Sequence, residues 1–216
     1  MSTKRPLEDC RLYTFVDTGY LNDRSPTELA KQLCDGGSDL IQLRAKDLSP
    51  NEIAPIAHEI AEITEKAGVH FVINDHPTIA LSLPSPFVHL GQEDFFDQGH
   101  QTVEDLYPSQ PRPLIGLSTH APEQCQRAID AGADYVAIGP IYKTGTKPTA
   151  KPVTLDYVRW AATTVQIPWF AIGGINMRTL NDVLEAGAQR VCIVSDILNH
   201  EHPDRACQAV RDLLPS

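Results

Sequence analysis

The sequence predicts an α/β fold, a single (β/α)8 TIM barrel. The chain has 216 residues, 42% of them hydrophobic, which is enough for a sizeable core in one domain of this kind. Short apolar runs alternate with helix-like stretches, as in a parallel sheet covered by helices. Four of these runs follow a glycine of the type that ends helices, at Gly37, Gly68, Gly132 and Gly187. Spacings of 31, 64 and 55 residues between these glycines correspond to one, two and two strand–helix units, or about eight units in all.

Each predicted strand is short and apolar, as buried parallel strands are. The strands are expected over residues 11–16, 40–44, 71–74, 87–90, 114–118, 135–139, 169–173 and 191–195. Residues 11–216 would form the barrel, and residues 1–10, without the apolar run of a signal peptide, are expected to be a loose tail. A doubly wound open sheet is the alternative fold. No Gly-x-Gly-x-x-Gly turn follows the first strand, which disfavours its dinucleotide-binding form.

Several helix starts carry their own signals. Ser25 and Ser49 each open a capping box with proline at the first helical position. Thr154 and Asn176 are further N-cap candidates. Pro55 removes a hydrogen bond from a helix that starts at Ser49, so this helix is expected to kink or to begin later. The fourth helix, expected between residues 98 and 107, is short, polar and weakly anchored.

Composition disfavours several classes of partner. A net charge of -10 and a pI near 5.2 disfavour nucleic acid and anionic membranes, because both demand a broad positive surface. Five cysteines, with no Cys-x-x-Cys pair and no zinc-like histidine spacing, are typical of reduced thiols. No apolar run approaches the length of a membrane span. The sequence therefore predicts a cytoplasmic protein whose anionic substrates, if any, meet local positive charge.

The stretch DLIQLRAKD supplies that charge. Along a strand, successive side chains point to opposite faces, so Gln42, Arg44 and Lys46 share the face opposite Ile41 and Leu43. Such alternation is also typical of a strand that is half exposed to water. In a parallel sheet, however, both faces are normally covered, and a covered arginine and lysine need an anion.

In an eight-stranded α/β barrel the site is assembled at the C-terminal ends of the strands. The polar residues expected there from strands two to five are Gln42, Arg44, Lys46, Asn74, Asp75, Gln92, Glu93, Asp94, Ser118, Thr119 and His120. Asp75 and Asp94 stand on neighbouring strand ends and could hold Mg²⁺, which takes one or two carboxylates and completes its shell with water and substrate phosphate. The alternative is that Asp75 merely caps the next helix.

Later strand ends offer two phosphate-binding segments. Thr144, Thr146 and Lys147 lie in a loop whose hydroxyls, amides and ammonium could wrap a phosphate, or which is an ordinary surface loop. Gly173-Gly174 precedes one helix and Ser195 opens the final one, a pattern typical of the phosphate cup of this fold or of a simple tight turn. The sequence thus predicts two anion sites, one of them metal-assisted.

The segments QLRAK, INDH, HLGQED, GLSTH, GPIYKTGTKP, AIGGIN and VCIVSDI, in this order, resemble the thiamine phosphate synthase family. The resemblance covers almost the whole chain beyond the first ten residues. It implies a Mg²⁺-dependent transferase of thiamine biosynthesis that joins hydroxymethylpyrimidine diphosphate to thiazole phosphate and releases diphosphate. Both partners would be small molecules, and the sequence leaves the oligomeric state open, a homo-oligomer included.

The resemblance also implies roles for single residues. The diphosphate would be held by Gln42, Arg44, Lys46, Asn74 and Lys147, the Mg²⁺ by Asp75 and Asp94, and the thiazole phosphate by Thr144, Thr146, Gly174, Val194 and Ser195. Ser118 would lie near the pyrimidine, and Arg44, Lys46, Ser118 and Lys147 would act in catalysis. If diphosphate departs first, the pyrimidine ring stabilises the resulting cation, so the protein supplies mainly charge neutralisation and positioning. No nucleophile is needed, and neither His120 nor Cys125 is expected to be catalytic.

Other functions are compatible with parts of this pattern. A related thiazole tautomerase tends to lack the full diphosphate-binding set, which is present here. A non-catalytic barrel that senses a precursor would not need Asp75, Asp94 and Lys147, and an unrelated phosphate-sugar barrel would not need two aspartates beside an Arg-Lys strand end. His76 stands where the family commonly has arginine, so positive charge near the diphosphate would depend on pH, unless His76 only starts a helix.

Overall fold

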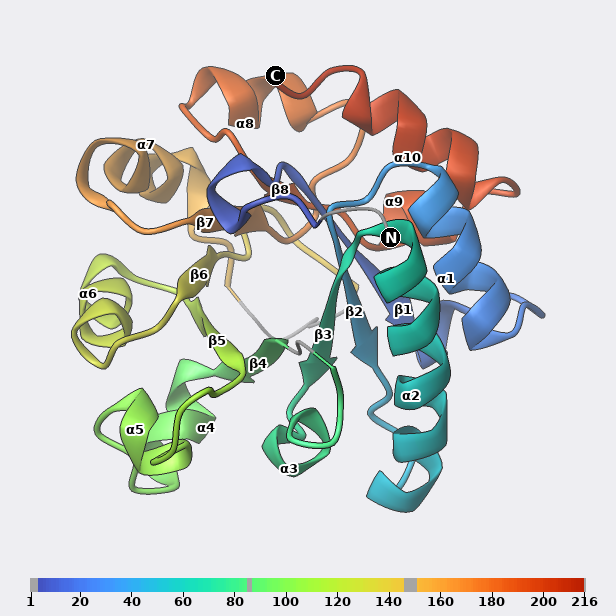
Figure 1. Ribbon diagram of the computed structural model, residues 1–216. Helices are drawn as coiled ribbons and strands as arrows, with labels where there is room; N and C mark the ends of the chain where they lie inside the picture. Colours follow the sequence, from blue (N-terminus) through green and yellow to red (C-terminus); the bar gives the residue numbers. More distant parts are fainter. Residues whose placement is uncertain (1–3, 85–86, 146–150, 216) are drawn as a thin grey trace.

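The protein, described by a computed structural model over residues 4–84, 87–145 and 151–215, forms a closed barrel of parallel strands. The strands are β1 (Leu12–Asp17), β2 (Leu40–Arg44), β3 (His70–Asn74), β4 (Phe87–Gly91), β5 (Leu114–Thr119), β6 (Tyr135–Ile138), β7 (Trp169–Ile172) and β8 (Val191–Cys192). Their spatial order follows the chain, and β8 pairs with β1 to close the ring. Figure 1 shows the helices arranged around the outside of this ring. The predicted (β/α)8 TIM barrel is confirmed.

The strand boundaries follow the sequence pattern closely. β2 matches at both ends, β3 to β7 differ by one residue at one end, and β1 is shifted by one residue at both ends. β8 is three residues shorter than predicted, because the backbone turns at Val194 and enters a helix at Ser195.

The helices include one or more after each strand. They are α1 (Pro26–Asp35), α2 (Pro50–Ala67), α3 (Pro77–Ala80), α4 (Gln92–Asp97), α5 (Val103–Leu106), α6 (Pro122–Asp130), α7 (Thr154–Thr164), α8 (Leu180–Glu185), α9 (Ser195–Leu198) and α10 (Pro203–Arg211), with 3-10 turns η1 (Leu7–Asp9) and η2 (Thr18–Tyr20). None of those in the described ranges has the length and apolar content that a membrane crossing requires.

The α2 helix begins where its capping box predicts and continues through Pro55, so a later start is wrong. Pro55 lies on the exposed face of the helix. Because proline has no N–H, the carbonyl of Asn51, four residues earlier, lacks its usual donor in the helix. Asn51 is itself exposed, so this carbonyl can bond to water. Ile53, Ala57 and Ile60 on the other face are buried and anchor the helix.

Other helix starts differ from the expected ones. The segment between residues 98 and 107 contains only α5, and a separate helix, α4, follows β4 directly, so Glu93 and Asp94 are helical. Thr154 is the first residue of α7 rather than its cap. Asn176 does cap a turn, since its Oδ1 accepts from Arg178 N at 2.9 Å, but α8 starts only at Leu180. Ser195 opens α9, whereas the final helix is α10.

The barrel interior below the site holds a chain of polar side chains. Gln42 Nε2 donates to the Tyr13 hydroxyl, which lies 3.3 Å from the Tyr135 hydroxyl, and that hydroxyl lies 3.1 Å from His89 Nδ1. Gly116 leaves room for this arrangement, because a Cβ there would lie 2.0 Å from the Tyr135 ring. Tyr13 and Tyr135 are fully buried, so the chain satisfies polar groups that water does not reach.

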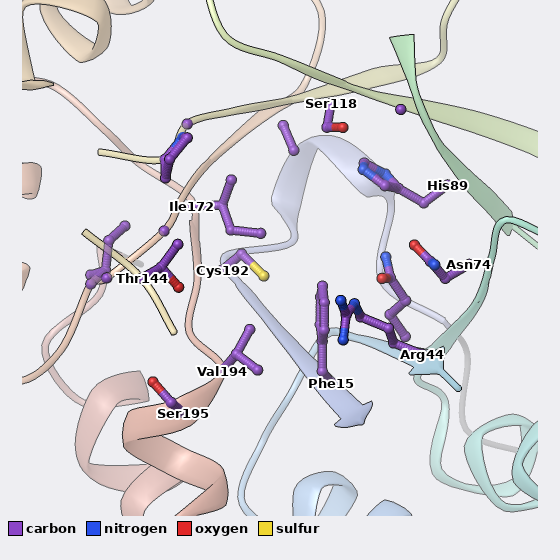
Figure 2. Close-up of a pocket in the computed structure, with 18 of the residues that line it drawn as sticks. Phe15, Arg44, Asn74, His89, Ser118, Thr144, Ile172, Cys192, Val194 and Ser195 are labelled. Carbon is purple, nitrogen blue, oxygen red and sulfur yellow. The ribbon is translucent and has the colours of Figure 1, made fainter. Parts of the chain in front are cut away.

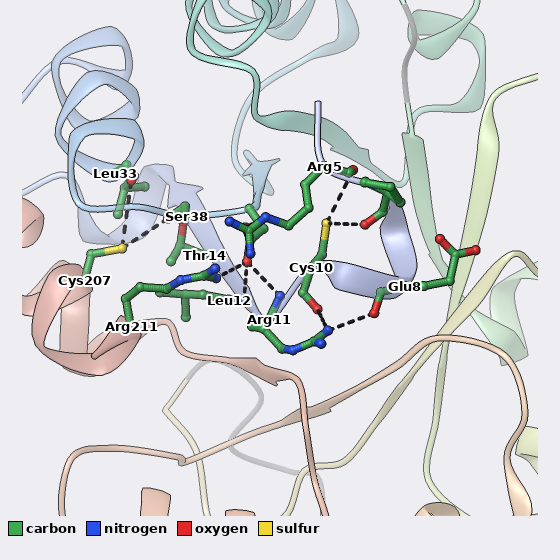
Figure 3. A network of polar contacts seen from close by, with 12 residues as sticks. Arg5, Glu8, Cys10, Arg11, Leu12, Thr14, Leu33, Ser38, Cys207 and Arg211 are labelled. Carbon is green, nitrogen blue, oxygen red and sulfur yellow. Dashed lines mark hydrogen bonds and ion pairs between the residues drawn. The ribbon is translucent and has the colours of Figure 1, made fainter. Parts of the chain in front are cut away.

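The opposite, N-terminal end of the barrel is closed by the first residues of the chain. Cys10 is fully buried, Lys4 pairs with Glu65 at 2.6 Å, and Asp39 accepts backbone hydrogen bonds from Arg11 at 2.7 Å and Leu12 at 3.0 Å. Arg211, from α10, joins the same network (Figure 3). Residues 4–10 are therefore packed against the barrel, contrary to the expected loose tail; residues 1–3 lie outside the described ranges.

Candidate active site

The C-terminal ends of the strands surround a pocket of about 930 Å³, counted to its open mouth. The predicted site residues that line it are Gln42, Arg44, Lys46, Asn74, Asp75, Asp94, Ser118, Thr144, Gly174, Val194 and Ser195. Figure 2 shows Arg44 and Asn74 on one side and Thr144, Val194 and Ser195 on the other. Thr146 and Lys147 lie outside the described residues. The structure therefore brings together every described residue for which the sequence predicts a binding, catalytic or metal role.

The polar face of β2 points into this pocket, as its alternation predicts. Gln42 forms part of the floor and is only 1% exposed. Arg44 Nη1 donates to Asp17 Oδ2 at 2.8 Å, and Lys46 Nζ pairs with Asp75 Oδ2. Arg44, at the end of β2, and Lys46, two residues beyond it, are thus each paired with a carboxylate.

Asp75 has a backbone conformation that needs explanation. Its φ of 61° is in the left-handed region, which is uncommon for a residue other than glycine. The amide of Asp75 donates to His89 O on β4 at 3.0 Å, and its Oδ2 accepts from Asn74 Nδ2 at 2.7 Å. These contacts hold the carboxylate at the pocket wall. The next helix, α3, is capped instead by the His76 backbone, whose carbonyl accepts from Ile79 N at 3.1 Å. His76 is not among the pocket-lining residues, which favours the helix-start interpretation.

Asp94 reaches the pocket from the first turn of α4, where it is exposed. It folds back over Gly91, and a Cβ at Gly91 would lie 2.8 Å from Asp94 Oδ2. Two carboxylates, Asp75 and Asp94, therefore face the same pocket as Arg44 and Lys46. With Asp17 included, these five side chains carry no net positive charge, so an anion there would need a further cation.

This donor set fits Mg²⁺, which takes few protein ligands and keeps water and substrate oxygens in its shell. Within the described residues, no group of three or more histidine, cysteine, aspartate or glutamate side chains could hold a metal ion. A dedicated cage of protein ligands is therefore not what this part of the chain offers. Asp75 and Asp94 are the residues suited to such an ion.

The other side of the pocket is built where the chain beyond β6 runs along the chain beyond β7. Ile141 N donates to Ile172 O and Tyr142 N to Gly173 O, both at 2.9 Å. Gly174 has a φ of +67°, and a Cβ there would lie 2.5 Å from Lys143 O. Only glycine permits this approach, which places Thr144 and Gly174 at the same pocket wall. Val194 and Ser195, at the start of α9, complete that wall.

The pocket also contains residues that the sequence analysis did not select. Phe15, His89, Ile172 and Cys192 line it from β1, β4, β7 and β8. A histidine in the middle of an apolar strand was the available signal for His89, whereas an inward-facing Phe15 looks like any core residue. Conversely, Gln92, Glu93 and Thr119 do not line the pocket although they stand near strand ends. Thr119 Oγ1 instead lies 2.7 Å from the Tyr157 hydroxyl of α7.

No described thiol in this region is suited to act as a nucleophile. Burial raises the pKa of Cys125 to about 11, and Cys125 is not a lining residue. Burial raises the pKa of Cys192 well above its usual value, so this pocket-lining thiol stays protonated at neutral pH. His120 does line the pocket, where its Nδ1 contacts Gly139 O and its Nε2 lies 3.9 Å from Glu93 Oε2.

Comparisons with known proteins agree with this geometry. The sequence profile of the family described as thiamine monophosphate synthase matches residues 12–197. The chain is 38% identical to the thiamine-phosphate synthase of Lawsonia intracellularis over 95% of its own length and 93% of that protein. It is 40% identical to the thiamine-phosphate synthase of Thermus thermophilus over 89% of its length and 88% of that protein. The structure resembles thiamine phosphate pyrophosphorylase from Pyrococcus furiosus, with a TM-score of 0.84, 26% identity and coverage of 95% and 96% of the two chains.

Proposed function

Since the chain belongs to the thiamine monophosphate synthase family, we propose that it joins 4-amino-2-methyl-5-(diphosphooxymethyl)pyrimidine to thiazole phosphate, giving thiamine phosphate and diphosphate, in a Mg²⁺-dependent reaction. The observation that supports the proposal is one pocket with Arg44 and Asn74 on one side and Thr144, Val194 and Ser195 on the other. Lys46 and Gly174 also line this pocket, and we expect each side to bind one anion. Two phosphorylated substrates that must react with each other need such an arrangement.

In this proposal the diphosphate occupies the side next to β2 and β3. Arg44 would donate from its planar guanidinium to phosphate oxygens, a geometry that suits arginine. Lys46 and Asn74 would add donors to the same group. Mg²⁺ held by Asp75 and Asp94 would supply the positive charge that the described side chains on this side lack. As the bond between pyrimidine carbon and diphosphate oxygen breaks, negative charge grows on the leaving group, and donors fixed in advance stabilise that charge most.

The pyrimidine then carries a cation that its own amino group stabilises, and the thiazole nitrogen attacks the exocyclic carbon. Ser118 would position the pyrimidine ring. The phosphate of the thiazole substrate would lie against Thr144, Gly174 and Ser195, which would hold the ring nitrogen in line with the carbon. Thr146 is expected to contact the thiazole phosphate and Lys147 the diphosphate, and both roles stay predictions.

The direct test is to mix the purified protein with both substrates and Mg²⁺ and to measure thiamine phosphate by chromatography. We expect product only when both substrates and the metal are present, and none in excess chelator until Mg²⁺ is restored. Undiminished turnover in chelator would overturn the metal assignment. Conversion of one isomer of the thiazole substrate into another, in the absence of the pyrimidine substrate, would instead indicate a tautomerase.

A further inference from the structure

Asp17, the last residue of β1, is not a pocket-lining residue, yet it holds the side chain of one that is. Its carboxylate is almost inaccessible, with 2% of the side chain exposed. Oδ2 accepts from Arg44 Nη1 at 2.8 Å, and Oδ1 accepts from Gly19 N at 3.0 Å. One oxygen therefore fixes Arg44 while the other is fixed by the turn η2.

The barrel register places this carboxylate beside Arg44. β1 and β2 are parallel neighbours, and Asp17 is the residue opposite Arg44. Asp17 also shares a strand face with Phe15, which lines the pocket. The amide of Gly19 accounts for the second oxygen, so the carboxylate has two directional partners and no freedom to follow a mobile arginine.

Arg44, the last residue of β2, and Lys46, two residues beyond it, differ in how they are held. Lys46 and its partner Asp75 have 50% and 28% of their side chains exposed, and Asp75 itself faces the pocket. Arg44 and Asp17 have 16% and 2% exposed. A ligand or metal that engages Asp75 would compete for the contact with Lys46. The Asp17 carboxylate is buried and does not line the pocket, so its contact with Arg44 would persist.

We propose that Asp17 is a positioning residue that fixes the guanidinium of Arg44 in the direction in which it meets the diphosphate. This inference rests on the proposed function, because it assumes that diphosphate binds beside Arg44. An arginine already held in one rotamer loses little side-chain entropy when its ligand binds.

A simpler role makes the opposite prediction. If Asp17 only offset the charge of Arg44, removal of its negative charge would raise the local positive potential and tighten the binding of anions. If Asp17 positions Arg44, removal weakens that binding. The sign of the change in diphosphate affinity therefore decides between the two roles.

The test measures binding of inorganic diphosphate in the presence of Mg²⁺ by calorimetry, for the wild type and Asp17→Asn. Asparagine keeps the shape but offers one oxygen and one NH₂, so either Gly19 N–H or Arg44 faces a donor. We expect the Kd to rise on the order of tenfold, with a matching rise in the KM for the pyrimidine substrate. An unchanged or lower Kd would overturn the proposal.

A double-mutant cycle with Arg44→Lys shows whether Asp17 acts through Arg44. Lysine keeps the charge and lacks the planar fork that needs aiming. In that background Asp17→Asn is expected to change the Kd by less than about twofold, since the interaction has already been removed. An equal loss in both backgrounds would contradict the positioning role.

Asp39→Asn is the matched control. Asp39 is also a buried aspartate beside β2 that holds an arginine, Arg211, and accepts backbone hydrogen bonds, but it lies at the other end of the barrel (Figure 3 shows its partners Arg211, Arg11 and Leu12). We expect it to lower Tm and to leave the diphosphate Kd unchanged.

A second variant of Asp17 and the behaviour of the wild type complete the test. Should Asp17→Asn not fold, Asp17→Glu keeps the charge and displaces the carboxylate, and wild-type affinity in that variant would overturn the proposal. Failure of the wild type itself to bind diphosphate with Mg²⁺ would count against the proposed function rather than against Asp17.

Discussion

Asp94 is the exposed member of the two carboxylates at the diphosphate side, and it is the simpler one to replace. We expect Asp94→Ala to weaken Mg²⁺ and diphosphate together, because each would complete the binding site of the other. The affinities for Mg²⁺ and diphosphate should fall by at least the factor of about ten to about a hundred that is typical of weakened metal contacts. Calorimetry at limiting Mg²⁺ measures it. Asp97→Ala, on the same helix α4 but away from the pocket, is the control; full activity of the Asp94 variant at limiting metal would refute the assignment.

Ser195 offers a test of the other anion side. A carboxylate introduced by Ser195→Asp would occupy the place of the thiazole phosphate and repel it. We expect the KM for thiazole phosphate to rise by about tenfold or more, with a much smaller change in diphosphate binding. Ser195→Asn has the same size without the charge and should be far milder. An equal loss of both ligands in Ser195→Asp would argue against two separate anion sides.

His70 links pH to stability at the base of the barrel. Burial is the main reason that its pKa lies below the usual value, and its Nε2 contacts Arg5 O at 2.7 Å. The folded state therefore favours neutral His70. The stability that His70 contributes is fully present above its unfolded-state pKa of about 6.5 and is lost as pH falls through its lower folded-state pKa.

We expect acidification from about pH 7.5 to about pH 5 to lower the free energy of unfolding less in His70→Gln than in the wild type, by up to about 1.4 kcal/mol per pH unit. Urea denaturation at both pH values measures the difference. Parallel loss in the two proteins would remove His70 from the explanation.

Among the connecting segments, the one around Gly174 makes the sharpest prediction. Gly174→Ala adds a Cβ at a φ of +67° and 2.5 Å from Lys143 O, so the loops beyond β6 and β7 must move apart. We expect weaker binding of thiazole phosphate as well as a loss of stability. Gly99→Ala has a similar φ of +92° and no heavy atom within 4 Å of the new Cβ. It should lose about 1 kcal/mol of stability through backbone strain alone, with an unchanged KM.

The elements show why part of this protein was predictable from sequence. The alternation of Gln42, Arg44 and Lys46 and the apolar strands depend on local periodicity, and the structure agrees with both. The pairing of Asp17 with Arg44 depends on the register between two strands, which no local pattern states. The course of α2 through Pro55 depends on which face of the helix meets water, and the early end of β8 depends on where α9 packs.

The site as a whole belongs to the complete ring. Every one of the eight strands contributes at least one residue to the pocket lining, in order Phe15, Gln42, Asn74, His89, Ser118, Ala137, Ile172 and Cys192. The two proposed anion sides lie on different arcs of the ring, the first on β2 to β4 and the second beyond β6 to β8. Neither arc alone could bring the two substrates face to face.

A ligand that binds only this closed form should stabilise the whole barrel. We expect Mg²⁺ and diphosphate together to raise Tm, since ligand at about 100 times its Kd adds about 2.7 kcal/mol to the free energy of unfolding. Each added alone should have a much smaller effect, because the described side chains at that side carry no net positive charge. Scanning calorimetry measures the shifts, and a full shift with diphosphate alone would contradict the charge argument.

The joint between β1 and β8 rests on two residue pairs, Leu12 with Val191 and Tyr13 with Cys192. During synthesis on the ribosome, β1 emerges early, whereas β8, its second neighbour in the sheet, emerges only after almost the whole chain has been made. Seven strands can pair in sequence order as the chain is made, but the pocket wall formed by Val194 and Ser195 is synthesised after all of them. A ribosome-bound chain that stops before residue 191 should therefore expose an open edge on β1 and should not yet recognise thiazole phosphate.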